Sequence, residues 1–435
     1  MLVAHREIFV PLLQTDNDQP HETPTRMKRI FCSAYLIGCV LMARSQGATF
    51  IAEIVNEGDV AMSDAPVVIA LDDVDGLTFD VRSARVEADG ESLPWQLDDM
   101  DGDGSADELA FLVDMDAHST RAYVITLSTT APDTAFTPRV YADMMLSDKR
   151  GKYPLITALE TPGSSYVYSD LHHHGPAFES ELTAYRIYFD HRQNIDIYGK
   201  RTRRLELADT HFYTTAEQLG QGYGNDVLWA GSSVGCGTLK LWNNGAPSDW
   251  NAVDKRRQRI VSAGPLRVVV DVEDVGVQLP DGPNTIRTRY TLYAGHRDVA
   301  VNISARCPLA AYTLCTGVQK VGDNPAYILR DDGIAASWGS DYPEQSSQAN
   351  KDLFPPEAVG LAVYVPDASR GEACDADLNA LYILASCPGK QLNYYLAFCA
   401  DKEADGYHSA QEWFAAVDAW KQVVDNPLQV SLYPQ

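Results

Sequence analysis

The sequence predicts an all-β protein, with a small N-terminal β-sandwich followed by a large β-sandwich domain and few helices. Short runs rich in β-branched residues, separated by Asn, Gly and Asp turns, recur from Thr49 onward. Only one segment, near the C-terminus, carries a capped helical pattern. Of the 435 residues, 45% are hydrophobic and 22% are charged, which is enough apolar material for a large domain plus a smaller one.

The first sandwich is predicted over residues 46–130. Its strands are expected at 49–55, 66–71, 79–86 and 122–127, a spacing typical of antiparallel sandwiches. The Thr- and Pro-rich segment 128–138 then links this domain to the next.

The large domain is predicted over residues 139–435. Its clearest strands are expected at 266–275, 285–293 and 298–305. Within the second of these, Ile286, Tyr290 and Leu292 share one face, and the two intervening arginines share the other. A capping box at Ser409–Glu412 predicts a helix over 413–424.

The N-terminal region predicts export from the cell. Met27-Lys28-Arg29 is a short basic segment, and the apolar stretch 30–43 ends in small residues suited to signal-peptidase cleavage. Residues 27–45 are therefore interpreted as a signal peptide of a periplasmic or secreted protein, and residues 1–26 as an upstream extension. The alternative is a lipoprotein anchored through Cys39. No run of 18 apolar residues predicts a spanning helix.

The net charge of the chain limits which binding partners are expected. With 60 acidic and 35 basic residues the formal net charge is −25, so nucleic acid is excluded as an expected partner. An anionic glycan would bind only where basic side chains gather in one cleft.

The six cysteines beyond the signal peptide lack zinc-ligand spacing and are expected to be mostly buried free thiols, although Cys307 and Cys315 are close enough in sequence to pair.

Residues 172–200 form the densest group of polar and aromatic side chains, with four of the ten histidines. If 185–190 is a strand, Tyr185 lies on one face and Arg186 and Tyr188 on the other, so that one face is core and the other a polar wall. Histidine titrates near neutrality, and arginine can clamp a carboxylate. The candidate site residues of this segment are His174, Glu179, Tyr185, Arg186, Tyr188, His191 and Arg192. The alternative is a polar surface loop followed by a strand with structural ion pairs.

The segment 99–108 resembles a calcium loop. Asp99, Asp101, Asp103 and Asp107 occupy positions 1, 3, 5 and 9, and a glycine stands at position 6. Position 12 is Ala110, so the closing bidentate carboxylate is absent. The sequence thus predicts either an incomplete Ca²⁺ site or an Asp/Gly hairpin turn.

Aromatic residues beside Gly and Asn are a third feature. Trp229, Trp242 and Trp250 lie within 22 residues, and sugar rings stack on such side chains. Trp229 and Trp242 are the predicted glycan-binding pair; burial in the core is the alternative.

Several segments together resemble an uncharacterised-domain family of bacterial polysaccharide-utilisation clusters. They include 94–109, 174–200, Gly264-Pro265-Leu266-Arg267 and 315–320, and the resemblance covers nearly the whole mature chain. It implies a galactose-mutarotase-type supersandwich and activity as an oligosaccharide dehydratase on uronic-acid glycans. Phe178 stands where the family pattern leads us to expect Trp.

The resulting hypothesis is a carbon–oxygen lyase acting by β-elimination on uronic-acid-containing oligosaccharides. His174 or His191 would be the base, Arg186 and Arg192 would neutralise the carboxylate, and Tyr185 or Tyr188 would protonate the departing hydroxyl. The alternatives are a mutarotase or epimerase on neutral sugars and a non-catalytic glycan-binding protein.

Overall fold

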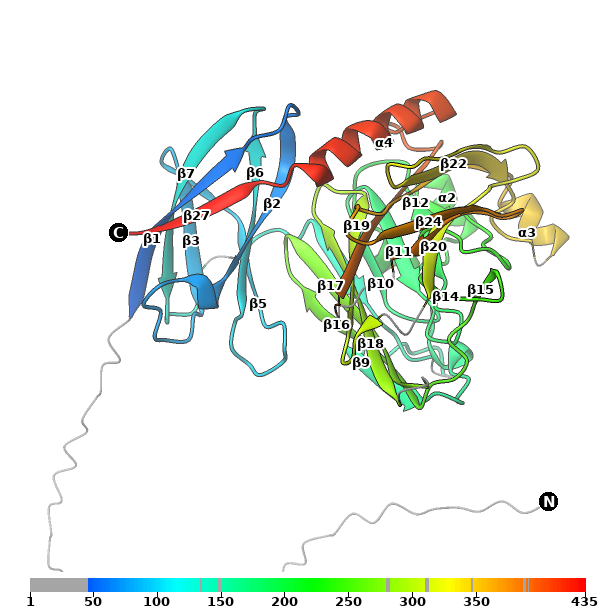
Figure 1. Cartoon of the computed structure of the whole chain (residues 1–435), viewed down its shortest axis with the longest axis horizontal. Helices are drawn as coiled ribbons and strands as arrows, with labels where there is room; N and C mark the ends of the chain where they lie inside the picture. Colours follow the sequence, from blue (N-terminus) through cyan, green and yellow to red (C-terminus); the bar gives the residue numbers. More distant parts are fainter. Residues whose placement is uncertain are drawn as a thin grey trace, which may run out of the picture. The chain divides into compact units, whose positions relative to one another are not determined.

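The computed structural model describes residues 46–133, 135–147, 150–278, 282–309, 313–345, 347–385, 389 and 391–435 (Figure 1). The predicted signal peptide, the upstream extension, Cys39 and Cys387 lie outside these residues. The described chain is built mainly of antiparallel strands, which confirms the predicted all-β class. Among the described residues no helix is both long enough and apolar enough to span a membrane.

The N-terminal sandwich consists of two antiparallel sheets. One has the order β27-β1-β7-β3-β4, with β27 (Gln429–Pro434), β1 (Gly47–Asn56), β7 (Ser119–Ser128), β3 (Ser83–Ala88) and β4 (Glu91–Leu93). The other has the order β2-β6-β5, with β2 (Met62–Ala70), β6 (Glu108–Met115) and β5 (Trp95–Asp98). Alternate residues such as Ile54, Phe111 and Ile125 point into one shared core, because successive strand side chains point to opposite faces. A 3-10 turn, η1 (Leu71–Asp73), follows β2.

The large domain is built on a nine-stranded sheet that packs against two five-stranded sheets. The long sheet has the order β21 (Ala326–Leu329), β22 (Ile334–Asp341), β23 (Glu357–Tyr364), β26 (Gln391–Ala400), β19 (Asp298–Ala305), β18 (Asn284–Tyr293), β17 (Arg267–Val277), β16 (Lys255–Ala263), β9 (Ala158–Pro162). Val270, Tyr290 and Leu396 of this sheet share one buried cluster with Ile197 and Val318 of the shorter sheets. This shared core makes the domain a layered β-sandwich.

The two shorter sheets carry the side chains of interest. The first has the order β13 (Asn225–Asp226), β12 (Ile195–Gly199), β11 (Thr183–Ile187), β10 (Ala177–Ser180), β8 (Val140–Asp143). The second has the order β15 (Ala246–Ser248), β14 (Lys240–Asn243), β20 (Leu314–Gln319), β25 (Asn379–Leu384), β24 (Arg370–Asp375). The short helical segments are η2 (Tyr168–Asp170), α1 (Leu207–Thr210), α2 (Ala216–Gly220) and α3 (Gln348–Leu353).

The strands predicted in the large domain are confirmed. β17, β18 and β19 match the expected runs, and Ile286 and Leu292 are buried while Arg287 and Arg289 lie on the opposite, partly exposed face. The predicted strand over 185–190 is shorter than expected, since β11 ends at Ile187. The chain then turns, and the Tyr188 amide donates to the carbonyl oxygen of Asn194 at 3.1 Å.

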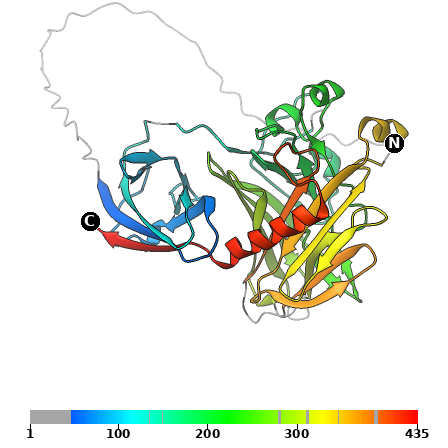
Figure 2. The same cartoon turned by 90° about the horizontal axis from the view of Figure 1, so that it is seen from above.

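The C-terminal segment crosses the predicted domain boundary. Helix α4 (Ala410–Asp425) begins at Ser409, whose side chain accepts from the Glu412 amide, so the predicted cap and helix are confirmed. The Glu412 carboxylate accepts from the amide of His408 at 2.7 Å. After the helix the chain enters β27, which pairs with β1 of the N-terminal sandwich (Figure 2). The expected domain 139–435 is therefore corrected, because its last strand belongs to the first sandwich.

Buried polar groups tie the first sandwich to the nine-stranded sheet. Arg267 is 3% exposed and bonds Asp98 and Glu108, both at 2.5 Å. The Gln96 side chain accepts from the amides of Leu266 and Arg267 at 2.9 and 3.0 Å. The segments around 94–109 and 264–267 thus meet in space.

The described cysteines are free thiols. Cys236, Cys315 and Cys399 are buried, Cys374 is partly buried and Cys307 is exposed. The predicted preference for free thiols is confirmed for these five, and Cys307 and Cys315 do not pair.

Candidate functional site

The candidate site is centred on Arg186 in β11. Strand alternation sends Tyr185 and Ile187 into the core and Arg186 to the opposite face. Asp196 lies directly across from Arg186 on β12, and its Oδ2 accepts from Nε at 2.9 Å and Nη2 at 2.6 Å. Asp226, on the next strand, lies 3.3 Å from Nη2. One buried guanidinium thus holds two carboxylates.

Tyr188 completes this polar group just beyond the end of β11. Its hydroxyl donates to Asp196 Oδ2 at 2.6 Å and lies 3.4 Å from Nη2 of Arg186. Burial, followed by the Asp196 charge, raises the pKa of Tyr188 well above its usual value. Tyr188 therefore keeps its proton across the neutral pH range.

Aromatic rings enclose the two arginines. The guanidinium carbon of Arg186 lies 4.2 Å from the ring centre of Phe212 and 5.3 Å from that of Tyr213. The guanidinium of Arg192 lies over the rings of Tyr168 at 5.1 Å and Tyr188 at 5.3 Å. Such contacts stabilise cations where water is largely excluded.

The imidazole of His174 lies against the same rings. It stacks on Tyr168 with ring centres 3.5 Å apart, and its edge faces Tyr188 at 5.8 Å. Nδ1 is 2.7 Å from the Tyr168 carbonyl oxygen, which can only accept, so Nδ1 carries the hydrogen and Nε2 keeps its lone pair. Burial, assisted by the positive charge of Arg186, lowers the pKa of His174 from 6.5 to about 4. His174 is thus neutral at neutral pH.

Two further histidines extend the cluster toward the surface. His172 stacks on Tyr153 with ring centres 3.7 Å apart, and meets His211 and Tyr213 edge-on, each at 5.7 Å. Tyr153 and Tyr213 are 40% and 44% exposed, so the cluster reaches solvent through these rings. Burial lowers the pKa of His172, which favours the neutral imidazole.

His173 points the other way, into the protein. It is fully buried, with Nε2 2.8 Å from Asp143. Burial lowers the pKa of His173 and raises the pKa of Asp143 to about 7, so burial favours the uncharged form of each group. His173 therefore supports the cluster from beneath.

Of the predicted site residues, His174, Arg186, Tyr188 and Arg192 come together. His191 does not: it lies in the turn after β11, with Nε2 3.8 Å from Asp249, and its ring makes none of the cluster's aromatic contacts among the described residues. The site also includes side chains that sequence patterning missed, from the segment between β8 and β9, from η2 and from the segment after α1: Tyr153, Tyr168, His211, Phe212 and Tyr213.

Two predicted site residues are structural instead. Tyr185 is fully buried and donates to the carbonyl oxygen of Arg297, whereas the Tyr188 hydroxyl lies in the polar group around Arg186. Glu179 is also fully buried, paired with Lys200 and accepting from the amide of Leu207 at 2.8 Å. A substrate-binding role for Glu179 is therefore corrected to a structural one.

The three tryptophans differ in exposure. Trp229 is 41% exposed, Trp242 in β14 is partly buried, and Trp250 is 1% exposed within the large core. Trp229 is the one whose ring is most available to a ligand.

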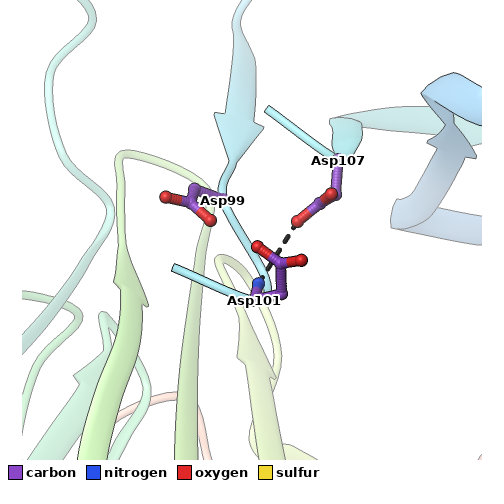
Figure 3. A group of neighbouring side chains, drawn as sticks. All are labelled: Asp99, Asp101 and Asp107. Carbon is purple, nitrogen blue, oxygen red and sulfur yellow. Dashed lines mark hydrogen bonds between the residues drawn. The ribbon is translucent and has the colours of Figure 1, made fainter. Parts of the chain in front are cut away.

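The predicted calcium loop forms the turn between β5 and β6 (Figure 3). Carboxylate oxygens of Asp99, Asp101 and Asp107 lie within 4.8 Å of one another, and Asp103 is outside this group. The loop's own amides bond these carboxylates: Gly102 and Gly104 donate to Asp99 at 2.6 and 2.8 Å and lower its pKa. The oxygen donors suit Ca²⁺, but the same bonds close an Asp/Gly hairpin turn, so both interpretations stand.

Comparison with known proteins places this site in a family context. Two solved structures from Enterococcus faecalis are similar at 8% sequence identity. One is a protein in the Glycosyl Hydrolase Family 38, with a TM-score of 0.46 over 88% of this chain and 47% of that chain. The other, an alpha-mannosidase from strain V583, has a TM-score of 0.45 over 88% of this chain and 46% of that chain. The present chain thus spans about half the length of these structures.

No curated protein matches the sequence. The profile of one family matches residues 54–430, which is nearly all of the described chain. The chain belongs to the family described as Domain of unknown function (DUF4861).

Proposed function

We propose that the protein is a carbon–oxygen lyase of the dehydratase type, which removes water from uronic-acid-containing oligosaccharides at the cluster around Arg186. The observation that carries the proposal is the pairing of a neutral His174, with Nε2 free to accept a proton, with a protonated Tyr188 whose ring meets it at 5.8 Å. An elimination needs one group of each kind within reach of neighbouring carbons. The family resemblance found in residues 174–200 supports the same chemistry.

His174 is the proposed base. The Tyr168 carbonyl fixes its tautomer, and stacking on Tyr168 fixes the plane of its ring. The low pKa keeps the imidazole unprotonated, although it also makes the free imidazole a weak base. An anionic substrate bound beside it would raise that pKa, since a nearby negative charge favours imidazolium.

Two guanidinium groups make the proton next to a sugar carboxylate removable. Arg192 binds buried Asp190 through Nε and Nη2, and its side chain remains 34% exposed. Arg186 is more deeply buried, and its Nη1 has no hydrogen-bond partner among the residues the structure describes. A buried donor without a partner is costly, and a substrate oxygen is one group that would satisfy it. We assign Arg192 to the carboxylate and Arg186 chiefly to positioning Tyr188 and Asp196.

The proposed reaction balances as a loss of water. His174 Nε2 takes the proton α to the carboxylate, and the electron pair of that C–H bond forms a carbon–carbon double bond as the β-hydroxyl leaves. The Tyr188 hydroxyl, which donates to Asp196 in the free protein, turns its hydrogen to that leaving hydroxyl and gives up the proton, so that the hydroxyl departs as water. Transfer of the proton from imidazolium back to tyrosinate, directly or through solvent, restores both groups. The positive charge of Arg186 supports the transient tyrosinate at 3.4 Å.

A second candidate function is glycan binding without catalysis, favoured by the exposure of Trp229 outside the cluster. In that case substitution of His174 would leave glycan affinity unchanged, and substitution of Trp229 would abolish it. A mutarotase or epimerase on neutral sugars would interconvert anomers or epimers without loss of water.

The test is incubation of the protein with a panel of uronate oligosaccharides while following ultraviolet absorbance from the new conjugated double bond. Absorbance that grows with wild-type protein and is lost in His174→Ala supports the proposal. Absence of absorbance across a broad panel overturns it.

A further inference from the structure

Arg192 also lines a polar pocket that shares no other residue with the cluster. It is lined by Arg192, Asn194, Ser232, Ser233, Lys240 and Asp249. Arg192 therefore contacts both the cluster and the pocket. Its guanidinium lies over the rings of Tyr168 and Tyr188, and the same side chain lines the pocket. The pocket and the cluster are therefore adjacent through this one side chain.

The base of the pocket is held rigidly by Lys240. This side chain is 4% exposed, and Nζ donates to the Arg192 carbonyl oxygen at 2.6 Å, to Asn194 at 2.9 Å and to Asp249 at 2.6 Å. All three ammonium hydrogens are thus used within the protein. Lys240 fixes the pocket and has no donor left for an anion.

The charges around the pocket cancel in pairs. Lys240 pairs with Asp249, and Arg192 pairs with Asp190. The Asp249 side chain is 34% exposed, and its second oxygen meets only the distant His191 at 3.8 Å among the described residues. That oxygen can accept a hydroxyl proton, while it would repel a second carboxylate.

An exposed tryptophan, Trp229, lies next to Gly231, which also lines the pocket. The ring of Trp229 lies against Gly231, where an added Cβ would come within 3.4 Å of Nε1. Gly231 has φ +55°, which glycine adopts without strain. Ser233 Oγ lies 2.7 Å from both the Ala230 carbonyl oxygen and Gln319 Oε1, which share its single hydrogen, and Gln319 donates to the Trp229 carbonyl oxygen at 3.2 Å. The loop that carries this indole is therefore firmly anchored.

We propose that this pocket is a second sugar subsite, which binds an uncharged pyranose joined to the reacting uronate. The ring face of that sugar stacks on Trp229, and its hydroxyls bond Asp249 and the exposed Ser232. The inference rests on the proposed function, because it takes the cluster as the place where the uronate reacts. It adds that the substrate is at least a disaccharide whose next residue is neutral.

Calorimetric titration tests this with glucuronic acid and with a glucuronosyl-glucose disaccharide, using the full chain. The disaccharide is expected to bind at least about tenfold more tightly than the monosaccharide. Trp229→Ala and Ser232→Ala are each expected to lower affinity for the disaccharide, by about tenfold for the tryptophan, and to leave the monosaccharide affinity unchanged. Tyr433→Ala is the matched control, since Tyr433 is 48% exposed but belongs to the N-terminal sandwich.

Equal affinity of wild type for the two sugars, or disaccharide binding that is the same in Trp229→Ala and Tyr433→Ala, overturns the subsite. The dehydratase proposal fails separately, by absence of ultraviolet absorbance while the disaccharide still binds. Turnover of both sugars with equal kcat/KM would retain the lyase and remove the subsite.

Discussion

His174 and Tyr168 form a stacked pair, with ring centres 3.5 Å apart and the histidine Nδ1 2.7 Å from the tyrosine's own carbonyl oxygen. A single residue thus sets both the plane and the tautomer of the imidazole. His174 sits at a positive φ of 68°, so the backbone is also held in an uncommon conformation there. Strain of this kind persists only where surrounding contacts fix it, which is typical of functional positions.

Substituting His174 and His191 in turn distinguishes the two candidate bases between which the sequence does not decide. His174→Gln is expected to lower kcat by about 10² to 10⁴-fold, because it removes the proton acceptor. His191→Gln is the matched control, since His191 lies 3.8 Å from Asp249 and away from the aromatic cluster. Initial rates of absorbance increase measure both variants. A larger loss in His191→Gln than in His174→Gln would contradict the assignment.

The pH dependence of kcat/KM reports the same imidazole. Its pKa is lowered to about 4, and only the neutral form accepts a proton, so activity should be lost as pH falls through about 4. Above that pH the base is ready and the rate should be flat through neutrality. A profile measured from pH 3 to pH 9 in buffers of constant ionic strength tests this. An acid limb near the ordinary histidine value of 6.5 would show that His174 is not the base.

Tyr188→Phe tests the proposed acid. The variant keeps the ring between Arg186 and Arg192 but loses the hydroxyl that bonds Asp196 at 2.6 Å. We expect kcat to fall by about 10² to 10⁴-fold with little change in KM. Tyr213→Phe is the control, because the Tyr213 ring also contacts the Arg186 guanidinium but is itself partly exposed. Equal activity of wild type and Tyr188→Phe would remove tyrosine from the reaction.

The two arginines should behave differently when replaced. Arg186→Ala leaves buried Asp196 without its cation and removes a partner of partly exposed Asp226, so the free energy of unfolding should fall by about 3 to 5 kcal/mol. Arg192→Ala removes a partly exposed cation and should raise KM for a uronate about tenfold or more. Its loss of stability should be smaller, because buried Asp190 keeps the backbone amides of residues 192 and 193 as donors. Urea denaturation and steady-state kinetics measure the two effects. A KM unchanged in Arg192→Ala would argue against carboxylate binding there.

Part of this site could be predicted from sequence because it depends on local geometry. The alternation that separates Tyr185 from Arg186 follows from the two-residue period of a strand. His191 was misplaced because β11 ends at Ile187 and the chain turns back, with Tyr188 bonded to Asn194 across the turn. Tyr168 and Tyr213 reach the cluster from η2 and from beyond α1, through contacts that no local pattern encodes.

In the fold too, the features set by local sequence were predicted and those set by distant contacts were not. Helix α4 was predicted because its cap is encoded locally, in Ser409 and Glu412, two residues three positions apart. The return of the C-terminus to the first sandwich was not, since strand pairing across nearly the whole chain leaves no local trace. The sequence shows only that β27 is a short run of strand-forming residues after Pro427.

Removal of β27 provides the last prediction. Six residues of β27 pair with β1, and Leu428 and Leu432 pack on the core of the first sandwich. Deleting residues 428–435 should lower the stability of that sandwich by roughly 3 kcal/mol, from lost apolar burial and exposed strand-edge amides. Hydrogen exchange measured by mass spectrometry should then quicken in Gly47–Asn56, whereas β17 and β18 should keep their protection. Deletion of Gln435 alone is the control, because Gln435 lies beyond the end of β27. Unchanged exchange in β1 after the longer deletion would mean that the first sandwich does not depend on the C-terminal strand.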